Sequence, residues 1–167
     1  MDISDNPDLI RNYLTVKGCN EEKISHIIDK YKSIMLFHIF INSRDEHNGN
    51  WGIIEGQNNT FDFTPIYDLE GGLAENKLKI RPIYIGDKYD DEAMLEFLLK
   101  SDKVMEYANT LLNIDMDKVY EDINKRKKIT IPEDRKKEVN DVIEKSKIKL
   151  QKVLNIIKKE KEEEQQK

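Results

Sequence analysis

The chain has 167 residues, of which 38% are hydrophobic and 37% are charged, and its formal net charge is −5. This length suits one domain with a hydrophobic core and is short for two ordinary domains. The acidic balance gives no general case for direct nucleic-acid binding, and the single cysteine, Cys19, excludes an intrachain disulfide. The first residues do not resemble a secretory signal, and no apolar run approaches the roughly 18 residues of a membrane span. We therefore expect a cytoplasmic protein without a membrane partner.

Charge is distributed unevenly along the chain. Residues 1–120 carry 13 Lys and Arg against 22 Asp and Glu, whereas residues 121–167 carry 15 against 11. Three interpretations follow: the basic end docks on the acidic body, it docks on a partner, or it is an ordinary solvated amphipathic helix.

Two helices are predicted before residue 44. Asn6-Pro7 is a helix start, with Asn6 as the cap and Pro7 in the first helical position, and Gly18 ends this helix. Asn20 precedes a second helix with two acidic residues in its first turn. This helix is amphipathic at first and becomes almost continuously apolar over residues 36–41. Such an ending places the following loop near the centre of the domain.

A short hairpin is predicted next. Residues 51–54 and 60–64 have strand composition, and residues 56–59 between them are typical of a turn. Asp62 alternates with apolar neighbours, which places it on the solvent side. Residues 77–85 are compatible with an extended segment, although Pro82 disfavours a central strand.

The remainder of the chain is predicted to be helical from Asp90 onward, with one helix over 116–127 and a capping box at Thr130–Glu133 that opens the last helix at about residue 132. The apolar residues of that helix recur every three or four positions and form a packing seam: Val139, Ile143, Ser146, Leu150, Val153 and Ile157. We expect a mainly α fold with one short β-hairpin, one domain over residues 1–157, and a charged, disordered tail over 158–167.

The polar loop that follows the second predicted helix contains most of the residues that indicate a function. Asp45 and Asn50 are five residues apart, and Asp68 follows the predicted hairpin. One carboxylate can accept a proton while an amide oxygen and a second carboxylate hold Mg²⁺, with His47 orienting either the Asp45 carboxylate or the loop backbone. The alternative is that Asp, Asn and Gly simply form turns here. The sequence contains no Cys/His cluster with zinc spacing and no nucleophile elbow, and we interpret His26 and His38 as packing or surface residues.

The string Asp45-Glu46-His47-Asn48-Gly49-Asn50-Trp51-Gly52, followed by Pro65-Ile66-Tyr67-Asp68, resembles the HipA-like serine/threonine kinases. It is more distantly similar to the phosphatidylinositol-kinase-like kinases. The resemblance implies a protein-kinase-like C-terminal lobe, with Asp45 as catalytic base and His47 on the family's loop histidine. It implies that Asn50 and Asp68 bind Mg²⁺ and that ATP is the phosphoryl donor. Glu46 departs from the family, which usually has Arg at this position.

A complete kinase also needs a glycine-rich phosphate loop and a strand lysine, but the residues before Asp45 are predicted to be helical. The first hypothesis is therefore the catalytic lobe of a Ser/Thr kinase that acts on a protein substrate and needs an N-lobe absent from this sequence. It would be a truncated product, an excised domain, or one half of a split kinase completed by another chain. The alternative is a catalytically inactive binding module, acting as a regulator or toxin–antitoxin partner. A third possibility is an unrelated helical domain that contains the motif by chance.

Overall fold

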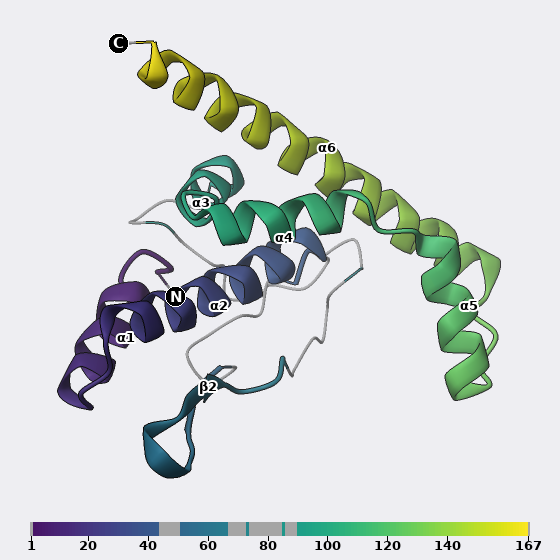
Figure 1. Cartoon of the computed structure of the whole chain (residues 1–167). Coiled ribbons are helices and arrows are strands. Elements are labelled where there is room, and N and C mark those ends of the chain that lie inside the picture. Colours follow the sequence, from purple (N-terminus) through teal and green to yellow (C-terminus); the bar gives the residue numbers. More distant parts are fainter. Residues whose placement is uncertain (1, 44–50, 67–72, 74–84, 86–89, 167) are drawn as a thin grey trace.

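The computed structural model describes residues 2–43, 51–66, 73, 85 and 90–166 (Figure 1). The described residues form a mainly helical fold with one antiparallel two-stranded hairpin, which confirms the predicted fold class at that level. In chain order the elements are α1 (Asn6–Val16), α2 (Glu21–Phe40), β1 (Ile53–Glu55), the 3-10 turn η1 (Gln57–Asn59), β2 (Phe61–Phe63), α3 (Asp91–Leu98), α4 (Asp102–Leu112), α5 (Met116–Lys127) and α6 (Glu133–Gln165).

The first two helices begin and end close to the predicted residues. Asp5, and not Asn6, occupies the position before α1, because Asn6 is buried and its Nδ2 donates a 2.8 Å hydrogen bond to the hydroxyl of Tyr31. The predicted cap at Asn6 is therefore wrong by one residue. Gly18 has a φ of +78°, which favours glycine, and it ends α1 as expected. Asn20 caps α2 by accepting from the backbone N–H of Lys23.

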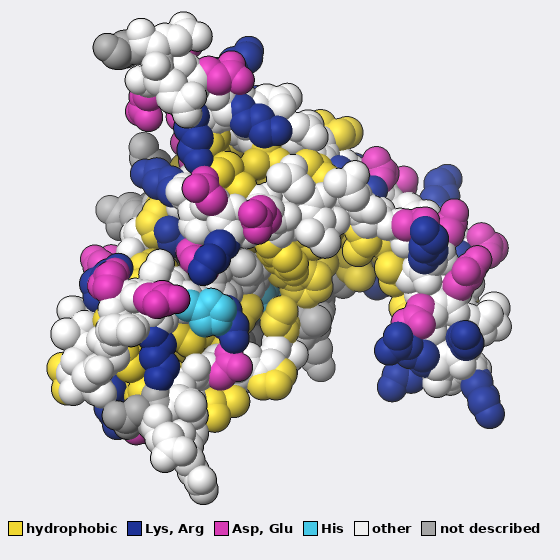
Figure 2. Space-filling view, viewed as in Figure 1, with side chains coloured by type: hydrophobic (Ala, Val, Ile, Leu, Met, Phe, Trp, Pro, Cys, Tyr) yellow, Lys and Arg dark blue, Asp and Glu magenta, His cyan; other side chains and the backbone are white. Residues whose placement is uncertain are grey.

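Helix α2 is the central element of the domain. It packs against α1, β2, α3, α4 and α6, and its last turns are buried nearly all round, as the apolar run predicted. Figure 1 shows α3 and α4 lying between α2 and the long helix α6, while α5 stands away from the hairpin and α1. In Figure 2, hydrophobic side chains fill the junction beneath α6 and charged side chains cover the outer faces.

The hairpin has the predicted strands and turn. Ile53 pairs with Phe63 and Glu55 with Phe61, and both Phe side chains are buried. Asp62 lies on the exposed side, as expected, with its carboxylate 2.5 Å from the Lys30 ammonium. That hydrogen bond lowers the pKa of Asp62 and ties β2 to α2.

The last helix differs from the sequence expectation at both ends. It starts at Glu133 without a side-chain cap, so the predicted capping box at Thr130 is wrong. The chain is helical as far as Gln165, and within the stretch where we expected a disordered tail Lys161 pairs with Asp102 of α4 at 2.8 Å. The predicted seam faces the body: Val139, Ile143, Leu150, Val153 and Ile157 are buried, together with Val142 and Leu154.

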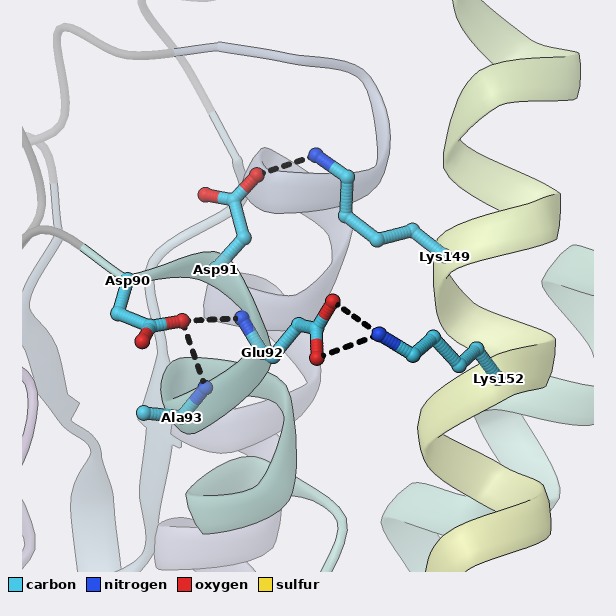
Figure 3. Close-up of polar contacts among 6 residues, drawn as sticks. All are labelled: Asp90, Asp91, Glu92, Ala93, Lys149 and Lys152. Carbon is cyan, nitrogen blue, oxygen red and sulfur yellow. Dashed lines mark hydrogen bonds and ion pairs between the residues drawn. The ribbon is translucent and has the colours of Figure 1, made fainter.

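Ion pairs attach the middle of α6 to the start of α3 (Figure 3). Lys149 Nζ lies 2.5 Å from Asp91 Oδ2, and Lys152 Nζ lies 2.7 and 2.9 Å from the two oxygens of Glu92. Asp90 caps α3 by accepting from two backbone N–H groups of its first turn. Part of the basic C-terminal region therefore docks on the acidic body, which was one of the three interpretations of the charge distribution. Within the described residues, none of the helices combines the length and apolarity that a membrane crossing requires.

Candidate functional site

The four predicted site residues, Asp45, His47, Asn50 and Asp68, lie outside the described residues. Glu46, the departure from the family pattern, lies there too. The residues on either side of both segments are described. The geometry of these flanking residues is therefore what the structure contributes to the candidate site.

The first flank lies at the end of α2. Ile41 and Ser43 are buried, and the Ser43 N–H donates to the carbonyl of His38 at 2.8 Å. Asn42 between them has a φ of 57°, a left-handed conformation that Asn adopts more readily than most residues. The N–H of Leu73 donates to the carbonyl of Ile41 at 2.6 Å. The chain therefore returns, after Asp68, to the point at which the segment containing Asp45 begins.

The second flank joins the end of the polar loop to the end of the hairpin. The Thr64 N–H donates to the carbonyl of Gly52 at 2.9 Å, and the Gly52 N–H donates to Thr64 Oγ1 at 3.0 Å. Gly52 follows Asn50 by two residues, and Thr64 precedes Asp68 by four. Two hydrogen bonds thus hold together the chain leaving the first candidate segment and the chain entering the second.

An aromatic cluster supports this second flank. The ring centroid of Trp51 lies 5.3 Å from that of Tyr31 and 5.6 Å from that of Phe63. Tyr31 is fully buried and accepts the hydrogen bond from Asn6, so α1, α2 and β2 all contribute to holding Trp51. Large aromatic side chains bury much apolar area with little conformational freedom. The flank is therefore positioned by the core, in the way that a precise site requires.

Two buried donors border the polar loop. Ser43 Oγ and Trp51 Nε1 are buried and have no hydrogen-bond partner among the described residues. A buried polar group left without a partner costs about 1–3 kcal/mol, so native structures rarely keep one without a reason. Sequence reasoning did not single out either group, nor the role of Thr64 Oγ1 as an acceptor. The only signal for them was their adjacency to the polar segments.

Histidine 38 is a packing residue. It is fully buried in the last turn of α2, and burial lowers its pKa to about 4. The side chain is therefore neutral at physiological pH. His26, earlier on α2, is exposed. The two histidines match the packing and surface roles expected for them, and neither is part of the loop flanks.

Two cavities lie beside the flanks. One of about 390 Å³ lies between α2 and β2 and reaches Thr64, Pro65 and Ile66, the last described residues before the segment containing Asp68. The other, of about 140 Å³, lies between α2, α3 and α6 and is lined in part by Asn42 and Lys149. Among the described residues, no three His, Cys, Asp or Glu side chains gather in a group that could hold a metal ion.

Comparison with known proteins identifies no relative: no family model matches the chain, and neither the curated proteins nor the solved structures include a match.

Proposed function

We propose that this chain is the C-terminal catalytic lobe of a HipA-like serine/threonine kinase, which transfers a phosphoryl group from ATP to a protein hydroxyl with Mg²⁺. The proposal rests on the resemblance of the loop and of the Pro-x-Tyr-Asp segment to that family. Its main structural support is the double hydrogen bond between Gly52 and Thr64. This pairing brings the ends of the two motif segments together.

Chain length limits how far the proposed metal ligands can lie from this pairing. Asn50 is two residues from Gly52 and Asp68 is four residues from Thr64. An extended chain covers at most about 3.3–3.6 Å per residue. The Cα atom of Asn50 is therefore at most about 7 Å from that of Gly52, and the Cα atom of Asp68 at most about 14 Å from that of Thr64. Two ligands of one Mg²⁺ each lie about 2.1 Å from the ion. Both side chains are therefore within reach of a single ion near the Gly52–Thr64 pairing.

Each site residue has a distinct proposed role. Asp45 accepts the proton of the substrate hydroxyl, and His47 orients the loop that carries it. Asn50 and Asp68 provide oxygen ligands for Mg²⁺, and the ATP phosphates and water complete its coordination. Glu46 adds a negative charge where the family usually has a cation, which weakens phosphate affinity.

In this proposal the remaining contacts come from an N-lobe that lies outside the described residues. Residues 2–43 form α1 and α2, and the described residues contain no strand lysine beside a glycine-rich phosphate loop. Removing one preorganised charge-stabilising contact costs about 3–4 kcal/mol of barrier. Phosphoryl transfer by this chain alone is accordingly slow. The same observation favours the second candidate function, a kinase-lobe binding module without catalysis that acts as a regulator or toxin–antitoxin partner.

The only tryptophan of the chain, Trp51, follows Asn50 directly and provides a probe of metal binding. We expect Mg²⁺ with ATP to change its fluorescence in the wild type and in Asp45→Ala, but not in Asn50→Ala or Asp68→Ala. Asp62→Ala is the matched control, because this exposed carboxylate lies on the adjacent strand outside the proposed ligand set. An unaltered response in Asp68→Ala would rule out the assigned metal ligand.

Phosphotransfer separates the two candidate functions. It is measured from ATP in the presence of a kinase N-lobe supplied as a separate chain, with wild type, Asp45→Ala and Asp68→Ala compared. Loss of activity in both variants supports the catalytic lobe. Equal activity in all three contradicts the role assignment. A metal response without phosphotransfer favours the binding module.

A further inference from the structure

Two groups of basic residues in the C-terminal region have different surroundings. Lys149, Lys152 and Lys161 of α6 pair with carboxylates of α3 and α4. A second group lies where α5 ends and α6 begins, and Figure 2 shows dark blue side chains gathered at the end of α5. We call this second group the basic tip; it consists of Lys125, Arg126, Lys127, Lys128 and Lys137.

Most cations of the basic tip have no ion-pair partner among the described residues. Lys125, Lys127, Lys128 and Lys137 are exposed, and none forms an ion pair or side-chain hydrogen bond with a described residue. Lys137 shares a surface hollow with Asp134, Glu138 and Asp141, so the concentration of positive charge is greatest at Lys125, Lys127 and Lys128. Among the described residues, Arg126 pairs only with Asp122, one turn earlier on the same helix. Like charges gathered on one surface repel each other, so an anionic partner relieves an unfavourable arrangement there.

The basic tip is held in a defined geometry. The hydroxyl of Tyr120 on α5 lies 2.8 Å from Asn140 Oδ1 and 3.2 Å from the carbonyl of Lys136, both on α6. Tyr120 is buried, and Lys128 closes α5 in a left-handed conformation with a φ of 54°. A surface held in place before binding loses less conformational entropy when a partner docks.

Apolar side chains accompany the cations. Ile129 directly follows Lys128 and is 55% exposed. A cavity of about 320 Å³ between α5 and α6 is lined by Tyr120, Asn124, Thr130, Ile131 and Lys136, and also by Asp117 and Glu121. The apolar part of this surface therefore consists of Ile129, Ile131 and the Tyr120 ring, and the rest of the lining is polar.

The side chains of this surface fit an acidic peptide better than a nucleic acid. A phosphate backbone carries uniform negative charge and would meet Asp117 and Glu121 in the cavity, on a chain whose net charge is −5. A short acidic peptide needs to touch only the basic tip, and an apolar side chain within it can occupy the cavity between α5 and α6. We propose that the basic tip docks an acidic segment of a partner protein that carries an apolar anchor residue. This proposal does not depend on kinase activity.

The test uses a short fluorescein-labelled peptide of glutamates with a central Leu–Phe pair, an all-glutamate peptide of the same length, and a DNA duplex. Binding to the full chain is measured by fluorescence anisotropy at two salt concentrations. The test variant is Lys125→Glu/Lys127→Glu. The matched control is Lys158→Glu/Lys159→Glu, because these two lysines are also exposed, form no ion pair with a described residue and lie on the far part of α6. All four positions are on the surface, and circular dichroism verifies that both variants fold.

We expect the test variant to weaken binding of the Leu–Phe peptide by about tenfold or more and the control variant to weaken it by less than about threefold, with both effects falling at high salt. We also expect the Leu–Phe peptide to bind more tightly than the all-glutamate peptide. Equal weakening in the two variants, or equal affinity of the two peptides, would overturn the proposal. Tighter, tip-dependent binding of the duplex would also overturn it and would assign the basic tip to nucleic acid.

Discussion

Burial of His38 makes the stability of this protein depend on pH in a defined window. The folded pKa is lowered from 6.5 to about 4 by burial, whereas the unfolded chain has the ordinary value of about 6.5. Between these values the unfolded state binds the proton more strongly than the folded state does. The free energy of unfolding therefore falls as pH falls, with the His38 contribution complete above about pH 6.5 and lost by about pH 4. One pKa unit corresponds to about 1.4 kcal/mol, so this contribution is about 3 kcal/mol.

Urea unfolding at pH 7.5 and pH 4.5 measures this effect. Carboxylates also titrate over part of this range, so the informative quantity is the difference between wild type and His38→Leu. We expect the free energy of unfolding to fall by about 2–3 kcal/mol more in the wild type than in His38→Leu between pH 7.5 and pH 4.5, because the variant has no imidazole to protonate at position 38. Any packing change introduced by leucine is common to both pH values and cancels. His26→Leu, at an exposed position of the same helix, is the control for replacing a histidine by leucine. An identical pH dependence in wild type and His38→Leu would refute the burial argument.

Two further predictions compare neighbouring or alternative substitutions. Leu150→Ala should lower the free energy of unfolding by about 2–5 kcal/mol because Leu150 is 1% exposed in the seam of α6. Ile148→Ala on the same helix, 71% exposed, should change it by less than about 0.5 kcal/mol, and similar losses in chemical denaturation would contradict the assigned face of α6. Gly18→Ala should cost about 1–2 kcal/mol through its positive φ alone, since a Cβ there meets no atom within 4 Å. Gly18→Asn should lower the free energy of unfolding by less than Gly18→Ala does, as measured by thermal unfolding. Equal losses in the two variants would point to a cause other than the backbone conformation.

The sequence predicted those structural features correctly that depend on residues close together in the chain. The end of α1 at Gly18, the start of α2 after Asn20 and the hairpin turn each depend on a few neighbouring residues, so the local pattern is sufficient to predict them. Two local predictions were wrong, and one of them reflects competition with a distant partner. Asn6 could cap α1, but its amide bonds Tyr31 of α2. Thr130 matches a capping box, but α6 begins without a side-chain cap.

The candidate site was predictable as a motif but not as a geometry. Asp45, Asn50 and Asp68 were identified from residue type and spacing, and their arrangement stays a prediction because they lie outside the described residues. The pairing of Gly52 with Thr64 joins residues that are separated by the whole hairpin. Only the strand register decides which backbone groups meet, and register is a property of the folded pair.

The amino-acid sequence by itself determined which segments are helical, which faces of the helices are apolar, and that the C-terminal region is basic relative to the rest. These properties follow from periodicity and composition, which do not depend on distant contacts. Only the tertiary structure decided that Lys149 and Lys152 pair with carboxylates of α3, while Lys125 and Lys127 pair with no carboxylate in the part of the chain that the structure describes. The reason is physical: an ion pair requires two charges within a few ångströms, and which charges come that close is decided by the packing of α6 across the body.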